Sequence, residues 1–258
     1  MYLRNSEWTS HLDNHHDAST GTAAAVSYQT QTTKFVCANE LLNSLPAEIL
    51  RELQPWLRRV KLSKEHFIFQ QDDEVDSIYF PESAIMSEFH LTEDGRMVEV
   101  ALTGRDSVIG LSGLFKADHV PNCVQVIQAG TALEIEAAKM RSIASQNPKL
   151  LTLLFGGLEH YIRQISQKAV CNMYHTLEAR FCTWLLRFND QSNRDVFKLT
   201  HEQLARILGV YRPSVTCIAL EMKKRSLIDY SRGGISITNR RRIEDLACGC
   251  YIEMQSAA

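Results

Sequence analysis

The stretch that decides the fold is "HEQLARILGVYRPSVT", residues 201–216. Apolar residues recur at helical spacing up to Leu208, Gly209 interrupts the pattern, and a second helical pattern starts directly behind Arg212-Pro213. Two short helices with so tight a corner are either core helices that adjoin or a helix-turn-helix whose second helix is presented to DNA. The residues around the corner favour the second interpretation.

The first of these helices begins with the pattern of a capping box. The hydroxyl of Thr200 can accept a hydrogen bond from a backbone amide, while the side chain of Gln203 reaches back to the start of the helix. In the second helix the expected buried stripe has the spacing i, i+3, i+4, i+7 and consists of Val215, Ile218, Ala219 and Met222. The polar residues at the start of the second helix therefore point away from the core.

The first turn of the second helix carries the residues expected to read DNA. A recognition helix enters the major groove with its N-terminal residues at the base edges, and its free amides also favour phosphate. Arg212 offers two parallel donors to guanine, a contact worth about 1–3 kcal/mol of discrimination, and Pro213 pre-sets the helical φ. The predicted DNA contacts are Thr200, His201, Tyr211, Arg212, Pro213, Ser214, Thr216 and Cys217.

A wing is expected behind the two helices. The stretch "LIDYSRGGISITN", residues 227–239, has the pattern of two strands around a glycine turn. Its Arg232 is the predicted backbone contact of the wing. The run Arg240-Arg241-Arg242 either adds sequence-independent attraction to phosphate or is a solvated basic face.

Residues 60–138 have the pattern of short strands. The stretch "SAIMSEFHLTEDGRMVEVALTG", residues 83–104, alternates apolar and polar residues on both sides of Asp94-Gly95. An Asp-Gly pair between alternating segments is a strong hairpin signal. Several short strands with turns between them predict a small antiparallel sandwich or barrel.

A long helix is expected from Pro148 onward. Its apolar residues alternate at spacings of three and four, which is typical of a coiled-coil seam over two heptads. The predicted dimer interface consists of Leu151, Leu154, Leu158, Tyr161, Ile162 and Ile165. The alternative is a helix that packs only on its own sheet.

Composition and charge fit a regulator with two functional parts. The chain has 258 residues, enough for two domains, and 45% of them are hydrophobic. Its net charge of −2 is segregated, because residues 170–258 hold 13 Lys and Arg against 9 Asp and Glu, whereas residues 1–169 hold 15 against 21. A basic C-terminal part favours phosphate binding there.

Several classes of protein are excluded by what the sequence lacks. It has no apolar run of about 18 residues to span a membrane, and its N-terminus lacks an apolar secretory core, so we expect a cytoplasmic protein. No nucleophile–base pair or phosphate loop suggests an enzyme. Residues 1–36 lack apolar periodicity and are expected to form a disordered tail, in which His11, His15 and His16 are interpreted as solvated rather than as metal ligands.

The cysteines predict neither a disulfide framework nor a metal site. They are seven in number and scattered, namely Cys37, Cys123, Cys171, Cys182, Cys217, Cys248 and Cys250. No CxxC pair occurs, and Cys248-Gly249-Cys250 is too tight for two ligands in a familiar zinc or iron–sulfur spacing. We therefore expect no metal.

Local strings along the chain resemble the Crp/Fnr transcription regulators over about residues 37–252. The shared strings are "LLNSLP", "IYFPESAIMSEF", "DGRMVEVALTGRDSVIGL", "CNMYHTLEARFCTWLL" and "LTHEQLARILGVYRPSVT". The resemblance implies an α+β fold with an N-terminal antiparallel β-roll of the cyclic-nucleotide-binding type, a long dimerisation helix and a C-terminal winged helix-turn-helix. It implies a homodimer on double-stranded promoter DNA, with RNA polymerase as a further partner. The expected parts are the tail 1–36, the sensor domain 37–145, the dimerisation helix 146–170 and the DNA-binding domain 171–252.

The sequence departs from this family where relatives bind their effectors. Cyclic-AMP-binding members carry a glutamate where this chain has Leu111, and an Arg-Ser pair where it has Asn122-Cys123. Burying a phosphate without a cation is very costly, so cyclic AMP is not expected as ligand. Only Cys37 lies near the N-terminus, where the iron–sulfur members have a cysteine cluster, so no such cluster is expected either.

The sequence also departs from the family in the second helix of the helix-turn-helix, which we call the reading helix, and an alternative function remains open. Pro213 and Cys217 replace a glutamate and an arginine that read bases in relatives, so a different half-site sequence is expected. The alternative function is a redox- or ligand-sensing module in which the winged helix is a protein-interaction platform, with Cys123 and Cys217 as redox groups. The effector, the target promoters and the direction of regulation are not determined by the sequence.

Overall fold

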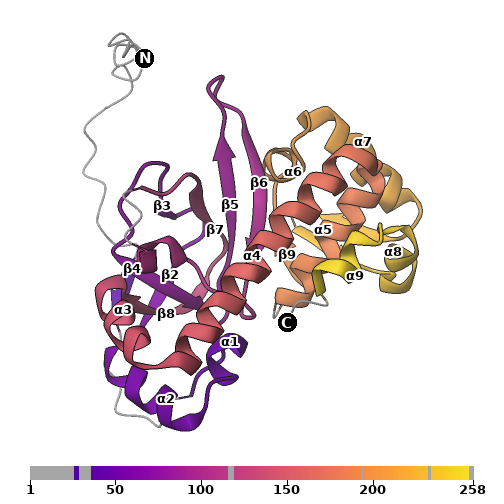
Figure 1. The fold of residues 1–258 in the computed structure, drawn as a ribbon. Coiled ribbons are helices and arrows are strands. Elements are labelled where there is room, and N and C mark those ends of the chain that lie inside the picture. The colour runs from indigo at the N-terminus through magenta and orange to yellow at the C-terminus, as the bar shows by residue number, and fades with distance from the viewer. Residues whose placement is uncertain (1–25, 29–35, 116–118, 193, 232–233, 256–258) are drawn as a thin grey trace, which may run out of the picture.

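A β-rich N-terminal domain and a mostly helical C-terminal domain are joined by one long helix, α4 (Pro148–Tyr174) (Figure 1). The computed structural model describes residues 26–28, 36–115, 119–192, 194–231 and 234–255. The predicted α+β fold is confirmed. Among these described residues, no helix is both long and apolar enough to cross a membrane.

Two four-stranded antiparallel sheets form the N-terminal domain. One sheet contains, in spatial order, β1 (Val26–Tyr28), β2 (Arg58–Leu62), β8 (Gly130–Glu136) and β4 (Ser77–Pro81). The other contains β3 (Phe67–Phe69), β7 (Cys123–Gln128), β5 (Ile85–Leu91) and β6 (Met97–Thr103). Val60 of the first sheet and Met86 and Val126 of the second are fully buried in one shared core. The antiparallel two-sheet domain predicted from the strand pattern is confirmed.

The hairpin β5–β6 turns at the predicted Asp94-Gly95 pair. Gly95 has φ +79°, a left-handed conformation that favours glycine. The amide of Thr92 closes the turn by donating to the carbonyl of Arg96 at 2.8 Å. The two strands extend beyond the rest of their sheet and lie beside the C-terminal domain (Figure 1).

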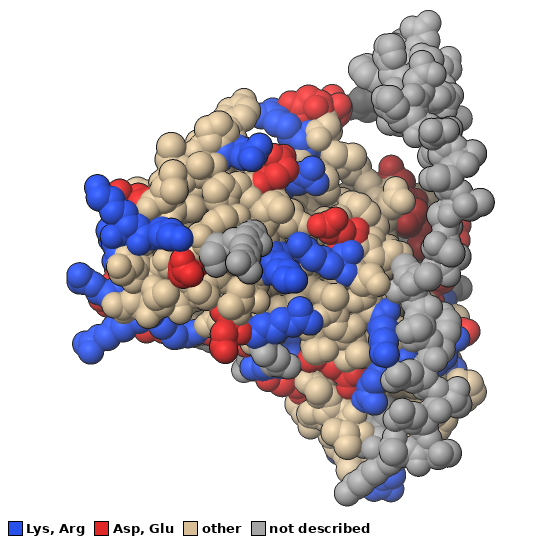
Figure 2. Space-filling view, turned by 180° about the vertical axis from the view of Figure 1, so that it is seen from behind, with Lys and Arg blue, Asp and Glu red and all other residues tan. Residues whose placement is uncertain are grey.

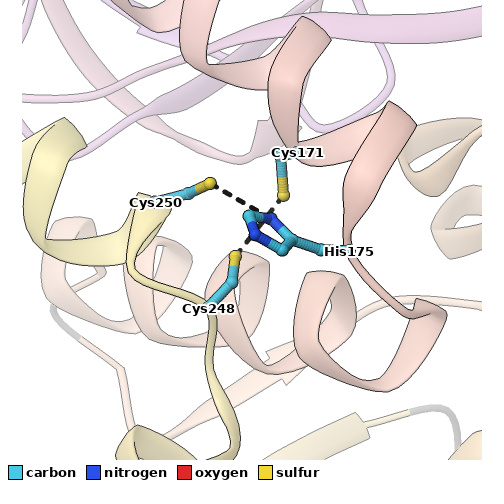
Figure 3. Close-up of side chains that lie close together, drawn as sticks. All are labelled: Cys171, His175, Cys248 and Cys250. Atoms are coloured by element: carbon cyan, nitrogen blue, oxygen red, sulfur yellow. Dashed lines mark hydrogen bonds between the residues drawn. The ribbon is translucent and has the colours of Figure 1, made fainter.

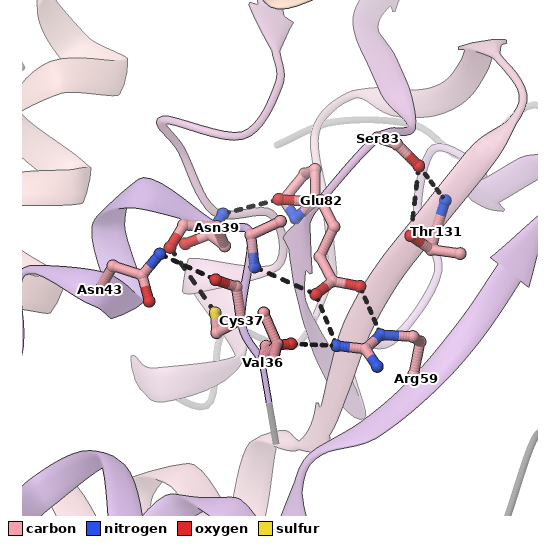
Figure 4. A network of polar contacts seen from close by, with 10 residues as sticks. Val36, Cys37, Asn39, Asn43, Arg59, Glu82, Ser83 and Thr131 are labelled. Carbon is pink, nitrogen blue, oxygen red and sulfur yellow. Dashed lines mark hydrogen bonds and ion pairs between the residues drawn. The ribbon is translucent and has the colours of Figure 1, made fainter. Parts of the chain in front are cut away.

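A polar network joins the chain before the first helix to strand β2 and to the end of β4 (Figure 4). Asn39 is fully buried, and its amide group donates to the carbonyls of Pro81 and Ser107 at 2.9 and 3.0 Å. Beside it, the guanidinium of Arg59 donates to the buried carboxylate of Glu82 at 2.7 and 2.8 Å. The helical elements of this domain are α1 (Glu40–Asn43), α2 (Ala47–Leu53), the 3₁₀ turns η2 (Gln54–Trp56) and η3 (Leu111–Phe115), and α3 (Ala137–Gln146).

Part of the expected N-terminal tail is structured. Residues 26–28 form β1, which pairs antiparallel with β2 so that Val26 lies opposite Leu62. The edge of a sheet offers unpaired amides and carbonyls to any extended segment. Such pairing does not require an apolar pattern in the segment, so the sequence did not predict this strand. His11, His15 and His16 lie outside the described residues.

Helix α4 packs its first half on the N-terminal domain. The helix starts at Pro148, as expected from the sequence, and the side chain of Asn147 caps it by accepting from the Leu150 amide. Leu150 and Leu154 are buried, and a Cβ added to Gly157 would lie 3.0 Å from Val108 Cγ1. With 27 residues the helix is about 40 Å long, and it reaches from the N-terminal domain to the C-terminal domain.

The C-terminal domain shares its apolar core with the β5–β6 hairpin. Its elements are α5 (Leu177–Gln191), β9 (Val196–Lys198), α6 (His201–Leu208), α7 (Arg212–Lys224), β10 (Ile228–Ser231), β11 (Gly234–Ile237), α8 (Arg240–Leu246) and α9 (Cys250–Gln255). The three strands form a small sheet in the order β10-β11-β9. One buried cluster joins Phe181 and Leu208 of this domain with Ile85 and Phe89 of the hairpin.

Candidate functional site

The corner between α6 and α7 has the geometry predicted from the sequence. The Thr200 hydroxyl accepts from the Gln203 amide at 3.1 Å, and the Gln203 side chain accepts from the Thr200 amide at 3.0 Å. Gly209 ends α6 with φ +62° and ψ +42°, a conformation that glycine adopts at little cost. Capping box and glycine corner are both confirmed.

The buried and exposed faces of α7 also agree with the prediction. Val215, Ala219 and Met222 are buried, and Ile218 is partly buried against the same cluster. At the start of the helix, Arg212, Pro213, Ser214 and Cys217 are exposed, and Tyr211 keeps 78% of its surface. This first turn is therefore open to solvent.

His201 and Thr216 are both partly buried, and their side chains contact each other. The Nδ1 atom of His201 lies 2.9 Å from the Thr216 hydroxyl, and its ring packs on Tyr230 with a centroid distance of 4.6 Å. Burial lowers the pKa of His201, and the charge of Arg212 lowers it further. This pair joins the start of α6 to the exposed turn of α7.

The wing is held against α7 by Lys223. Its ammonium group donates to the carbonyl of Tyr230 at 2.9 Å and pairs with Asp229 at 3.0 Å. The strands β10 and β11 confirm the predicted hairpin, while Arg232 lies outside the described residues. Lys and Arg side chains project from the side of the molecule that the C-terminal domain forms (Figure 2).

The helix-turn-helix lies directly against the N-terminal domain. A Cβ added to Gly209 would lie 3.0 Å from Val98 Cγ2 of β6. The capping residue Gln203 also donates to Glu65 of the sensor domain at 3.0 Å, and Lys64 donates to the carbonyl of Lys198 at 2.8 Å. The β5–β6 hairpin and its neighbours thus contact the same helix that positions α7.

A cavity of about 290 Å³ lies between the sensor sheets and α4. Tyr161 of α4 donates its hydroxyl to Glu88 at 2.6 Å and accepts from the amide of Asn122 at 3.2 Å. Burial raises the pKa of Glu88 to about 6, although hydrogen bonds from Tyr161 and Asn122 act in the opposite direction. Among the described residues that line this cavity, none is Lys or Arg.

The predicted dimer residues of α4 divide between the protein interior and its surface. Leu154 is 2% exposed and belongs to the N-terminal core, and Tyr161 faces the cavity. Leu158 and Ile165 are partly buried, while Leu151 and Ile162 are exposed. The exposed apolar residues that the sequence reasoning missed include Phe155, Val170 and Met173.

Four ligand-type side chains meet where α4 ends. Cys171, His175, Cys248 and Cys250 bring their sulfur and nitrogen atoms within 4.8 Å of one another (Figure 3). The prediction of no metal considered Cys248-Gly249-Cys250 alone. The fold brings Cys171 and His175, which are one helical turn apart, next to this pair. The sequence signal for this grouping was the i, i+4 pair Cys171 and His175.

The two cysteines considered as redox groups differ in their surroundings. Cys217 is exposed on α7. Cys123 is buried, and its thiol donates to the carbonyl of Phe89 at 3.3 Å. Burial raises the pKa of Cys123, which disfavours the reactive thiolate.

Comparison with known proteins identifies both domains. The model of the cyclic nucleotide-binding domain matches residues 59–147, and that of the Crp-like helix-turn-helix domain matches residues 179–246. Among characterised relatives, the transcriptional activator protein Anr of Pseudomonas protegens is 24% identical over 72% of this chain and 79% of its own. The nitrogen fixation regulation protein FixK of Bradyrhizobium diazoefficiens is 27% identical over 83% of this chain and 90% of its own.

Solved structures with the same fold cover most of the chain. FixK2 from Bradyrhizobium japonicum has a TM-score of 0.64 at 15% identity and covers 75% of this chain and 98% of its own. The c-di-GMP-responsive global regulator CLP of Xanthomonas campestris has a TM-score of 0.62 at 16% identity, with 74% and 99% covered. With a sensor fold, a connecting helix and a helix-turn-helix in the order of these proteins, the chain belongs to the Crp/Fnr family of DNA-binding transcription regulators.

Proposed function

We propose that the chain is a homodimeric regulator that inserts the first turn of α7 into the major groove of a two-fold symmetric promoter site. The observation that carries this proposal is the exposed turn Tyr211–Ser214, which stands on a corner stabilised by Gly209 and by the capping box of α6. Family members bind DNA and are typically dimers, and a dimer of such motifs reads half-sites about one helical turn apart.

The proposed DNA contacts differ in kind. Arg212 contacts bases, with Pro213 and Cys217 beside it at positions exposed to the groove. Thr200, Tyr211, Ser214 and the wing residue Arg232 contact phosphates. His201 and Thr216, which bond to each other, contribute mainly by positioning the turn.

A second copy of the chain is the proposed partner of α4. Leu151, Phe155, Ile162 and Met173 lie on one stripe of the helix at spacings of four, seven and eleven residues, and they keep 37%, 49%, 55% and 74% of their surface. Phe155 also stacks on the exposed Phe115, so the apolar surface continues onto the sensor domain. Two such stripes cover each other in a parallel coiled coil, with the partly buried Leu158 and Ile165 at its flank and Leu154 and Tyr161 on the side of the protomer's own core.

We assign a role to each segment of the chain with the boundaries expected from the sequence. Residues 37–145 sense a signal, 146–170 dimerise, and 171–252 bind DNA. Since Lys168 and Cys171 of α4 both contact the C-terminal domain, a shift of the dimerisation helix moves the reading helix. RNA polymerase is the proposed further partner.

The signal is proposed to be neither cyclic AMP nor an N-terminal iron–sulfur cluster. The carboxyl of Glu88 faces the cavity together with Asn122, and a cyclic phosphate placed there would meet a negative group instead of a cation. A neutral or cationic effector fits this lining better. Redox control is a second candidate function, favoured by the exposure of Cys217 on the reading helix.

Selection of bound sequences from random DNA tests the proposal. With purified protein, the enriched sequences should contain two inverted half-sites whose centres lie about one helical turn apart. Enrichment of a single asymmetric half-site would contradict the dimer, and absence of any enriched motif would contradict sequence-specific reading. Repeating the selection after treatment with a thiol oxidant separates redox control from control by a ligand.

A further inference from the structure

We propose that Cys171, His175, Cys248 and Cys250 form a tetrahedral zinc site that ties the C-terminal helix α9 to the end of α4. All four ligands come from described residues of one chain. None of the four ligands lines the sensor cavity or belongs to the reading helix α7.

The four ligand atoms already have the spacing of a single tetrahedral ion. Cys171 Sγ lies 3.5 Å from Cys248 Sγ, Cys250 Sγ lies 3.4 Å from His175 Nδ1, and the whole set fits within 4.8 Å. With Zn–S bonds of about 2.3 Å, tetrahedral geometry separates neighbouring sulfur atoms by about 3.8 Å. Small side-chain adjustments are enough to admit the ion.

Local structure explains how two distant segments supply these ligands. Cys171 and His175 are one turn apart at the end of α4, where His175 is the C-cap residue. Cys248 and Cys250 flank Gly249 in the turn that starts α9. All three cysteines of the set are buried. Cys248-Gly249-Cys250 alone does not match a zinc motif, but helix α4 supplies the other two ligands.

Neighbouring side chains are arranged to support thiolates. Gln167 donates its amide to Cys250 Sγ at 3.0 Å. The Thr183 hydroxyl lies 3.1 Å from Cys248 Sγ and accepts from the Cys248 amide at 3.1 Å, which leaves its proton for the sulfur. Such outer hydrogen bonds orient metal ligands and balance their charge.

The net charge of the site is also compensated. Three thiolates and one neutral imidazole around a divalent ion leave one negative charge. Arg180 lines the small cavity that Cys171 and Thr183 also line, and it interacts electrostatically with both Cys171 and Cys248. A buried charge with a nearby guanidinium is far less costly than an isolated one.

The donor set favours zinc over other metals and over clusters. Three sulfur ligands and one imidazole are a familiar closed structural zinc set, and they leave no open position for catalysis. An iron–sulfur cluster distributes its ligands over several iron atoms, so it needs a wider arrangement than this one. Because the ligands join α4 to α9, zinc binding stabilises the docking of the C-terminal domain on the dimerisation helix.

Metal content of the full-length protein tests this site. We expect elemental analysis of protein purified under reducing conditions to give close to one zinc ion per chain and no acid-labile sulfide. After metal removal, cobalt(II) should restore the visible bands of a tetrahedral thiolate site. Cys171→Ser and Cys248→Ser should lose most of the zinc and of the cobalt spectrum.

Two variants separate metal binding from simple misfolding. Cys182→Ser changes a fully buried cysteine of the same domain that lies outside the cluster, and it should keep its zinc. His175→Cys converts the set to four thiolates and should also bind the ion, with a cobalt spectrum changed to that of a four-sulfur site. Loss of zinc in Cys182→Ser to the same extent as in Cys248→Ser would attribute the loss to folding and overturn the assignment.

Other results would overturn the proposal directly. Wild-type protein that carries no zinc and gives no tetrahedral cobalt spectrum has no such site. If the protein contains iron together with acid-labile sulfide, the site holds an iron–sulfur cluster and the assignment of zinc is wrong. Freshly prepared, unreduced protein can also be alkylated and its intact mass measured. If this shows a Cys171–Cys248 disulfide, the two cysteines form a covalent bond and are not metal ligands.

Discussion

The indole N–H of Trp184 in α5 lies 2.9 and 3.1 Å from the two carboxylate oxygens of Glu99 in β6. The same carboxylate accepts from Lys168 of α4 at 3.0 Å and from Ser87 of β5 at 2.6 Å. Glu99 is 1% exposed. One buried carboxylate therefore joins the β5–β6 hairpin, helix α4 and the DNA-binding domain.

Replacing this carboxylate should strongly destabilise the fold. Glu99→Ala leaves Lys168 and the Trp184 N–H without their shared partner, and breaking a buried ion pair in this way costs about 3–5 kcal/mol. Urea unfolding followed by tryptophan fluorescence measures the loss. Glu93→Ala, in the exposed hairpin turn, should change the free energy of unfolding by less than about 0.5 kcal/mol. Equal effects of the two variants would contradict the proposed link.

Arg212→Ala should weaken specific DNA binding. A bidentate arginine–guanine contact contributes about 1–3 kcal/mol, which corresponds to roughly a 5- to 150-fold loss of affinity. Gel shifts with the selected operator at one fixed salt concentration measure it. Arg51→Ala, an exposed arginine of α2 in the sensor domain, serves as the control and should bind as the wild type does. Unchanged affinity of Arg212→Ala would show that α7 does not read bases through this residue.

Introducing a charge into the exposed stripe of α4 should convert the dimer into a monomer. Phe155→Asp and Ile162→Asp each place a carboxylate where a second copy of the stripe is expected to pack, and burying an unpaired charge is too costly for the interface. Light scattering after size exclusion gives the molar mass. Lys149→Asp introduces the same side chain into the first turn of α4, away from the stripe, and should leave the protein dimeric. A dimeric Ile162→Asp variant would place the interface elsewhere.

The carboxyl of Glu88 should make the fold less stable as pH rises. Its pKa is about 6 in the folded protein against an ordinary value of 4.5, so the folded state binds the proton more tightly. Below about 4.5 both states are protonated, stability falls as pH rises from 4.5 to 6, and the loss, about 2 kcal/mol, is complete above that range. Glu88→Gln should therefore be more stable than the wild type at pH 7 but not at pH 4.

Urea unfolding of both proteins at several pH values checks this expectation. The difference in free energy of unfolding between Glu88→Gln and wild type should grow across the window from pH 4.5 to 6. Glu93→Gln, at an exposed position, is the matched control and should show no such trend. A pH-independent difference for Glu88→Gln would mean that its carboxyl is not buried in the way the cavity indicates.

Features that depend on neighbouring residues were determined by the sequence itself. The capping box of Thr200 and Gln203, the left-handed Gly209 and the Asp94-Gly95 turn each arise from hydrogen bonds and backbone preferences within a few residues. Such interactions have the same geometry wherever the segment lies in the fold. For this reason the helix-turn-helix and the long hairpin were predictable with their boundaries.

Features that depend on which surfaces meet were decided only by the tertiary structure. The periodicity of α4 contains two apolar stripes, and only the packing of Leu154 on the N-terminal core shows which stripe is buried and that Phe155 and Ile162 stay exposed. The grouping of Cys171 with Cys248 joins positions 77 residues apart. No local pattern carries such information, because the contact is made by the docking of α9 on α4 and not by the spacing of residues along the chain.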